Sequence, residues 1–196
     1  MKKGLVAILV VAAVVLGIFF WFQSTYNGMV KMDEGVQAAW SQVENVYQRR
    51  ADLIPNLVAT VKGYAAHEQE TLEGVISARS KATQITVDPQ NLTPEEIAKY
   101  QKAQGELGSA LGKLLAITEN YPDLKANENF MALQSQLEGT ENRIAVERQK
   151  FNETARGYNT VIRQFPKNIV AGMFGFEKKP YFEAQEGAQQ APEVKF

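Results

Sequence analysis

The sequence contains no cysteine and a single histidine, His67, in 196 residues. Without cysteine the chain can form no disulfide, no thiolate metal site and no thiol nucleophile. A helical zinc protease needs the pattern His-Glu-x-x-His, but the residue at the second histidine position after His67 is Thr71. We therefore predict no metal site, no cofactor and no catalytic residue.

An excess of basic residues is also absent, because 21 Lys and Arg stand against 22 Asp and Glu, for a net charge of -1. Binding to a nucleic-acid backbone depends on surplus positive charge, so we expect no nucleic-acid partner. The sequence also has no Gly-x-Ser-x-Gly motif and no glycine-rich phosphate-binding loop. These absences predict a protein that is not an enzyme.

Charged residues are missing from Gly4 to Phe22, an apolar run of 19 residues. As a helix rising 1.5 Å per residue, this run covers about 28 Å, close to the hydrocarbon thickness of a bilayer. The alternative is a cleaved signal peptide, but such segments have apolar cores of about 7–15 residues, and no small-x-small cleavage site follows here. We predict an uncleaved single-pass anchor whose lipid-facing residues include Leu5, Ile8, Val11, Val15, Phe19 and Trp21.

The charges on either side of this run are uneven. Lys2 and Lys3 precede it, whereas the first 20 residues after it carry only Lys31 against Asp33 and Glu34. The positive-inside rule then predicts that the N-terminus lies in the cytoplasm and the remaining chain outside it.

Beyond the anchor the sequence is helical throughout, since no alternating apolar-polar stretch is long enough to predict a strand. One apolar stripe predicts a first helix reaching to about Lys81. Pro55 interrupts this stripe, and either kinks a continuous helix or marks a restart with Asp52 as N-cap. The unbroken phase of the stripe favours continuity. The stripe consists of Val36, Trp40, Val43, Tyr47, Ile54, Leu57, Val61, Tyr64, Leu72 and Val75.

Two further helices have clear signals. Thr93, Pro94 and Glu96 form a capping box that starts one helix, which Pro122 ends. A last helix begins near Asn127 and carries a strict seven-residue apolar repeat, typical of left-handed helix packing. The repeat is Phe130, Leu137, Ile144, Phe151, Tyr158 and Phe165. The fold class is therefore all-α, an antiparallel up-and-down bundle of three long helices, or four if the first breaks at Pro55.

Three charged residues, Arg50, Glu68 and Glu147, fall on these apolar stripes. One explanation places them near helix ends or bundle edges, where long side chains reach water. The other is an interior ionic network, which adds little net stability but can fix the register of the helices.

Several segments resemble the LemA family of bacterial membrane proteins across residues 26–176. They are "YNGMV", "AWSQV", "RRADLIPNLVATVKGYAAHE", "YPDLKANENFMALQSQLEGTENRIAVERQKFNETARGYN" and "FPKNIVAGMFGF". The resemblance implies a bacterial inner-membrane protein with one transmembrane helix and a four-helix bundle, and it implies no agreed activity. We accordingly divide the chain into an N-terminal tail (1–3), an anchor (4–22), a bundle (26–176) and a C-terminal tail (177–196). The tail is too poor in apolar residues to fold and is predicted to be disordered.

The candidate residues for partner binding or register fixing come from the family signature, apart from Glu147, which comes from the heptad count. They are Arg49, Arg50, Asp52, Pro55, Asn56, His67, Glu68, Glu141, Asn142, Arg143, Glu147 and Tyr158.

Two classes of function follow. The first is a membrane-anchored scaffold that forms homo-oligomers or docks other envelope membrane proteins, because long heptad helices offer surface for packing. The second is a ligand-binding sensory bundle. It would need a partner protein, since only Met1, Lys2 and Lys3 lie beyond the anchor. An envelope hydrolase is a distant third, and would require a pocket that gathers two carboxylates or a carboxylate with His67.

Overall fold

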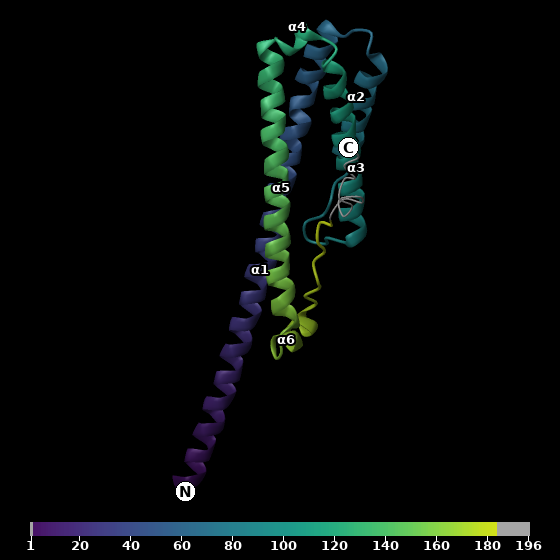
Figure 1. Cartoon of the computed structure of the whole chain (residues 1–196). Helices are drawn as coiled ribbons and strands as arrows, with labels where there is room; N and C mark the ends of the chain where they lie inside the picture. Colours follow the sequence, from purple (N-terminus) through teal and green to yellow (C-terminus); the bar gives the residue numbers. More distant parts are fainter. Residues whose placement is uncertain (1, 184–196) are drawn as a thin grey trace, which may run out of the picture.

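The computed structural model describes residues 2–183, and the fold is all-α, as predicted, with no strand in that part of the chain. Four long helices form the bundle, and two short ones lie at its ends (Figure 1). In chain order the helices are α1 (Lys2–Tyr64), α2 (Gln69–Gln84), α3 (Pro94–Thr118), α4 (Pro122–Lys125), α5 (Glu128–Arg163) and α6 (Lys167–Phe174).

Helix α1 has two parts with different surroundings. Its N-terminal part projects alone from one end of the molecule, and the rest packs mainly against α5, while α2 packs against α3 (Figure 1). At 63 residues and 1.5 Å per residue, α1 is about 95 Å long. It is the one helix among the described residues long and apolar enough to cross a membrane, and none of that apolar stretch is buried.

The first helix continues through Pro55, as the phase of its stripe predicted. Proline has no N–H to donate to the carbonyl four residues earlier. That carbonyl, on Ala51, instead accepts a hydrogen bond of 2.7 Å from Nε of Arg79 on α2. A side chain from the neighbouring helix thus replaces the missing helical bond.

The predicted continuation of this helix to about Lys81 is wrong, because the chain turns between Tyr64 and Gln69. Val61 before the turn and Val75 after it, two heptads apart, both reach the same core, so the seven-residue spacing persisted across a reversal of direction. Tyr64, assigned to the stripe, is 44% exposed. The bundle therefore has four long helices, and the break lies at residues 65–68, not at Pro55.

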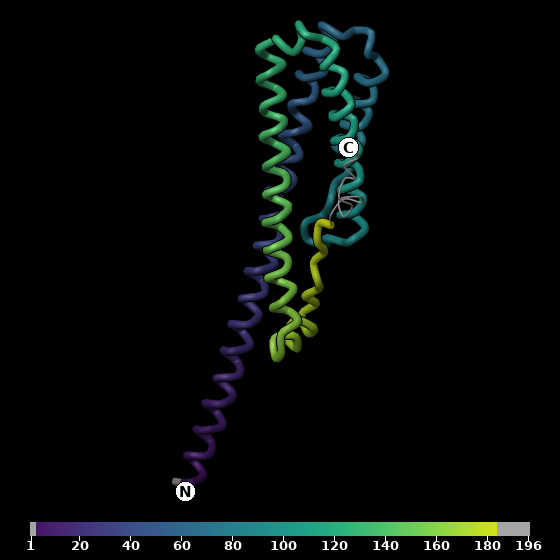
Figure 2. The backbone as a smooth tube through the Cα atoms, in the orientation of Figure 1, coloured from purple at the N-terminus to yellow at the C-terminus, as the bar shows by residue number. Residues whose placement is uncertain are grey.

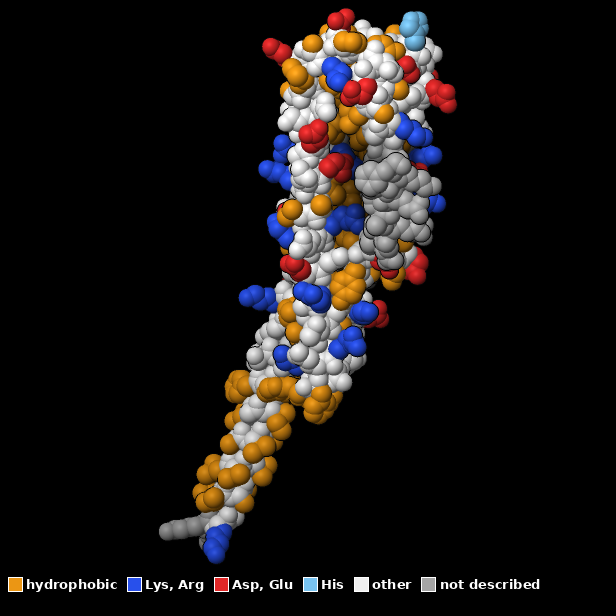
Figure 3. Space-filling model, in the orientation of Figure 1, with side chains coloured by type: hydrophobic (Ala, Val, Ile, Leu, Met, Phe, Trp, Pro, Cys, Tyr) orange, Lys and Arg blue, Asp and Glu red, His pale blue; other side chains and the backbone are white. Residues whose placement is uncertain are grey.

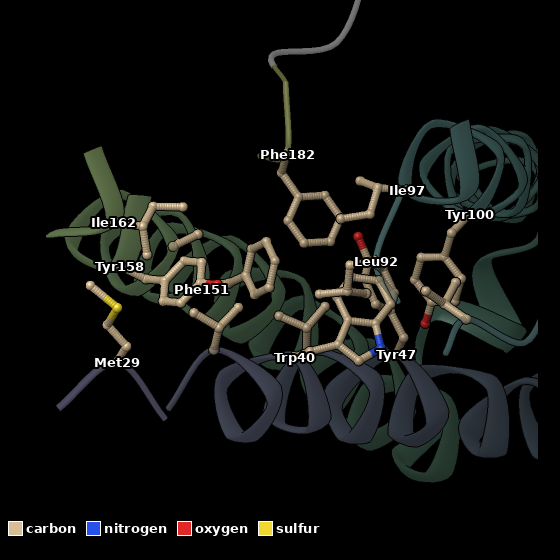
Figure 4. Packing of buried hydrophobic residues seen from close by; sticks show 14 of the residues in the cluster. Met29, Trp40, Tyr47, Leu92, Ile97, Tyr100, Phe151, Tyr158, Ile162 and Phe182 are labelled. Carbon is tan, nitrogen blue, oxygen red and sulfur yellow. The ribbon is translucent and has the colours of Figure 1, made fainter. Parts of the chain in front are cut away.

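The core consists of two clusters stacked along the bundle. The one nearer the projecting end of α1 is aromatic and centres on Trp40. The Trp40 ring stacks on Phe182 at 5.7 Å between centroids and meets Tyr100 and Phe151 edge-on (Figure 4). The other cluster, around Leu57, Leu107 and similar residues, is mostly aliphatic.

The predicted helix signals are largely present. Thr93 and Glu96 form the capping box of α3. In α5 the heptad residues from Phe130 to Tyr158 are all buried, but α5 ends at Arg163 and Phe165 is 82% exposed.

The prediction of a disordered tail from Glu177 is wrong for residues 177–183, which we call the strap. After α6 the strap runs back along the bundle in extended form (Figure 2), and its Phe182 is 5% exposed. Residues 184–196 of the predicted tail lie outside the described residues. Composition failed here because the strap is ordered by groups elsewhere in the chain: Phe182 packs on Trp40 and Phe151, and side chains of α5 bind the strap backbone.

Candidate functional site

Arg50 lies inside the bundle, at the level where the two core clusters meet. Its side chain is 3% exposed and belongs to α1 between Tyr47 of the aromatic cluster and Ile54 of the aliphatic cluster. Burial of a guanidinium at this depth requires hydrogen-bond partners for its donors. Of the two explanations for a charge on the apolar stripe, the interior one therefore holds for Arg50.

The partners of Arg50 lie on two other helices, α5 and α3. Its Nη1 donates to Oε1 of Glu141 on α5 at 2.7 Å. Its Nη2 donates to the side-chain oxygen of Gln104 on α3 at 2.6 Å and to the Gln104 carbonyl at 3.0 Å. One side chain thus joins α1, α3 and α5.

Aromatic and small residues complete this environment. The guanidinium carbon lies 5.1 Å from the centroid of the Tyr47 ring, within cation–π range. Gly108 of α3 lies beside the guanidinium, since a Cβ added there would stand in ordinary van der Waals contact with Nη1 of Arg50, at 3.8 Å. Burial raises the pKa of the Tyr47 hydroxyl, an effect that Arg148 and Arg50 oppose. The Nε of Arg50 finds no hydrogen-bond partner among the described residues.

A polar pocket of about 270 Å³ opens beside this cluster. Glu141, whose side chain is 48% exposed, and Arg148 bring opposite charges to its wall. The residues that line the pocket are Tyr47, Arg50, Gln101, Gln104, Gly105, Gly108, Ser109, Glu141, Ile144 and Arg148.

The strap is held by two asparagines of α5. The side-chain amide of Asn159 donates to the Lys179 carbonyl and accepts from the Lys179 N–H, both at 2.8 Å. Asn152 makes the same pair of bonds with the backbone of Phe182, at 2.9 and 2.8 Å. Each amide thus pairs with one residue of an extended backbone as a neighbouring β-strand would.

Lys179 is the buried polar side chain of the strap. It is 8% exposed, and its Nζ lies 2.9 Å from Oδ1 of Asp33 and 3.2 Å from the Gln90 carbonyl. Burial raises the pKa of Tyr158 to about 12, and the carboxylates of Asp33 and Glu177 add to this. The neutral ring of Tyr158 lies 5.9 Å from the Lys179 ammonium, within cation–π range.

The end of the strap lies next to the polar pocket. The Glu183 carbonyl accepts hydrogen bonds from Gln101 on α3 at 2.9 Å and from Arg148 on α5 at 3.0 Å. The Arg148 guanidinium also lies 4.8 Å from the centroid of the Phe182 ring. Gln101 and Arg148 also line the pocket, so the end of the strap adjoins the pocket between α3 and α5.

The other predicted site residues lie outside this site. Glu68 and Glu147 are at edges of the bundle, where Glu68 accepts from the Tyr121 hydroxyl at 3.0 Å and Glu147 pairs with Lys150 at 2.7 Å. His67 is exposed in the turn between α1 and α2, not on a helix as its sequence context suggested. The exposed candidates on α1 and α5 are Arg49, Asp52, Pro55, Asn56, Asn142 and Arg143.

Sequence reasoning missed Gln104, Asn152, Asn159, Lys179 and Phe182. One signal was available, because Asn152 and Asn159 stand seven residues apart, each directly after an apolar heptad residue. Two amides at this spacing lie on one face of a helix, two turns apart. The strap residues they bind carried no comparable signal.

The sequence of this chain is similar to those of several named bacterial proteins. Magnetosome protein MamQ of Magnetospirillum gryphiswaldense is 30% identical over 174 residues, covering 80% of this chain and 64% of that protein. Magnetosome protein MamQ 2 of Paramagnetospirillum magneticum is 30% identical over 175 residues, covering 81% and 64%. This chain therefore spans less than two thirds of the length of these curated relatives.

A further relative is Protein LemA of Metamycoplasma hominis, which is 27% identical over 172 residues, covering 87% of this chain and 75% of that protein. The LemA family model matches residues 39–196, which include the stretch of α1 that carries Arg50 and all of α2 to α6. The match confirms the resemblance drawn from the sequence, and the chain belongs to the LemA family.

Proposed function

We propose that this protein is a membrane-anchored helical-bundle scaffold of the bacterial envelope, acting by self-association or by docking other envelope membrane proteins. The observation that carries this proposal is the groove that the extended strap fills along α5, with α3 beside its end. Asn152 and Asn159 bind the strap through its backbone, so the groove accepts any extended segment with apolar side chains at suitable spacing.

The occupant that we propose for this groove in an assembly is the strap of a second copy. The left-handed Gly175, at φ 71°, ends α6 immediately before the strap and supplies a backbone position at which the strap can change direction. Exchange of an identical segment between copies preserves every groove contact, so it costs little beyond the entropy of association.

Self-association predicts that detergent-solubilised full-length protein behaves as a defined multimer when its mass is measured by light scattering on a sizing column. Replacing both Asn152 and Asn159 by alanine removes five hydrogen bonds to the strap and should reduce the multimer to single chains. Asn129→Ala, at an exposed position of the same helix, serves as the control. Single chains from the unmodified protein, or an unchanged multimer from the double variant, would contradict strap exchange.

The proposed orientation of the bundle in the membrane can be tested separately. Because the chain has no cysteine, a thiol reagent reacts only with a cysteine that is introduced. Thr86 is exposed in the loop between α2 and α3, in the half of the bundle that lies nearer the anchor. A Thr86→Cys variant should react with a membrane-impermeant thiol reagent in intact cells, because the positive-inside rule places the bundle outside the cytoplasm. Labelling that occurs only after lysis would reverse the topology.

The polar pocket favours the ligand-binding sensory bundle as a second candidate. It places the buried Arg50 and the half-exposed Glu141 in one wall, a pair of charges able to orient a small polar ligand. Such a sensor would still require a partner protein to carry its signal across the membrane.

Catalysis is not part of the proposal. The pocket gathers one carboxylate, Glu141, among the described residues, and that carboxylate is paired with Arg50. His67 lies in the turn between α1 and α2, outside this pocket. An envelope hydrolase would need a second acid or a base at the same place.

A further inference from the structure

Large apolar side chains are exposed at the end of the bundle from which α1 projects. Phe165 is 82% exposed, Ile169 54%, Met173 66% and Phe174 50%. Within residues 23–183, the other large apolar side chains with comparable exposure are Tyr64, Ile76, Met131 and Val146. Half of this exposed apolar set therefore falls within ten consecutive residues around α6.

These residues lie where the apolar run of α1 ends. The Phe174 ring is 5.7 Å from Phe22, the last residue of the run, and 4.6 Å from Tyr26 one turn further along. The Phe176 ring is 5.7 Å from Tyr26 as well. Figure 3 shows hydrophobic side chains gathered at this junction between the projecting helix and the bundle.

Helix α6 is held firmly enough to present these side chains in one direction. Its Val170 and Ala171 are buried in the aromatic core cluster. Its C-terminus is closed by Gly175 and by a hydrogen bond of 3.0 Å from the Phe176 N–H to the Ala171 carbonyl. One face of α6 thus belongs to the core, and the other leaves Ile169 and Met173 uncovered.

We propose that the exposed face of α6, together with Phe165, is a second membrane-contacting site, lying in the interfacial layer of the bilayer that α1 crosses. The proposal rests on the proposed anchoring by α1. A helix whose apolar face is exposed in this way buries it about 5–10 Å into the boundary between headgroups and acyl chains. Contact with Phe22 places α6 at this depth when residues 4–22 span the hydrocarbon.

The flanking charges favour a lipid surface over a second copy of the chain. Arg163, Lys167 and Lys178 lie within or next to this segment in the sequence, and Glu177 is the one acidic residue from 163 to 178. Basic side chains at this level reach anionic headgroups while their stems lie along apolar surface. A bundle held at both α1 and α6 stands at a defined tilt to the membrane, which sets how far the groove lies from the bilayer.

The test uses single cysteines in the full-length, cysteine-free chain. Met173→Cys, Val146→Cys and Val11→Cys are each spin-labelled and reconstituted in phosphatidylethanolamine–phosphatidylglycerol liposomes. Collision rates with oxygen, which concentrates in lipid, and with a water-soluble nickel chelate report depth. Val146, on α5, is the matched control because it is also apolar and 49% exposed.

We expect the oxygen-to-nickel ratio at Met173→Cys to exceed that at Val146→Cys by about threefold or more, as for an interfacial helix. Equal ratios at these two positions, with a high ratio at Val11→Cys, would overturn the α6 site alone. A low ratio at Val11→Cys would instead overturn the anchoring on which it rests. Low collision rates with both reagents at Met173→Cys, with spin–spin broadening that disappears on mixing with unlabelled protein, would mean that a second copy covers the site.

Discussion

Arg50→Ala is expected to lower the free energy of unfolding by about 3 kcal/mol, as when a buried hydrogen-bond network is broken. The change removes three hydrogen bonds and the apolar stem of a side chain that is 3% exposed. It also leaves the buried amide oxygen of Gln104 without its donor. Denaturant unfolding of the detergent-solubilised protein, followed by circular dichroism, measures the effect.

Two variants control for this interpretation. Arg49→Ala removes the same charge from an exposed neighbour and should change the unfolding free energy by less than about 0.5 kcal/mol. Glu141→Gln keeps an oxygen acceptor at a half-exposed position and should cost about 1 kcal/mol. Equal stabilities of the Arg49→Ala and Arg50→Ala proteins would mean that the Arg50 network does not hold α1, α3 and α5 together.

Phe182→Ala is expected to release the strap and to lower the free energy of unfolding by about 2–3 kcal/mol, below the usual 3–5 kcal/mol for a buried phenylalanine. The Phe182 ring stacks on Trp40 and meets Phe151 at 5.5 Å (Figure 4). The cost is limited because the strap can detach locally while the helices remain packed.

Fluorescence of Trp40 measures the release directly when Trp21 is replaced by phenylalanine, since these are the two tryptophans of the chain. Loss of Phe182 should expose the Trp40 ring to water and shift its emission to longer wavelength. Glu183→Ala is the control, because the structure uses the carbonyl of Glu183 and leaves its side chain exposed. An unshifted spectrum in the Phe182→Ala protein would show that the strap does not seal the aromatic core.

Parts of the fold that depend on neighbouring residues were predictable from the sequence. The apolar run from Gly4 to Phe22, the Thr93–Glu96 capping box and the α5 heptads each arise from residues within a few turns of one another. Their energetics are local, since a helix start needs only its own first turn and a stripe needs only a regular period. The unbroken phase of the apolar stripe also predicted correctly that α1 continues through Pro55.

The turn after Tyr64 and the ordered conformation of the strap could not be predicted from neighbouring residues. An apolar residue at heptad spacing faces the core equally well on a continuing helix or on one that has reversed direction, as Val61 and Val75 do. Phe182 gains its burial from Trp40 and Phe151, which no pattern near the C-terminus reveals.

For the candidate site, the sequence by itself marked Arg50 as a charge on an apolar stripe and Glu141 as part of a family signature. Only the tertiary structure decided that Arg50 bonds Glu141 and Gln104, which lie 91 and 54 residues away. The physical reason is range: helix propensity and membrane insertion are set by consecutive residues, whereas a buried charge is satisfied by whichever groups the packing of other helices brings to it.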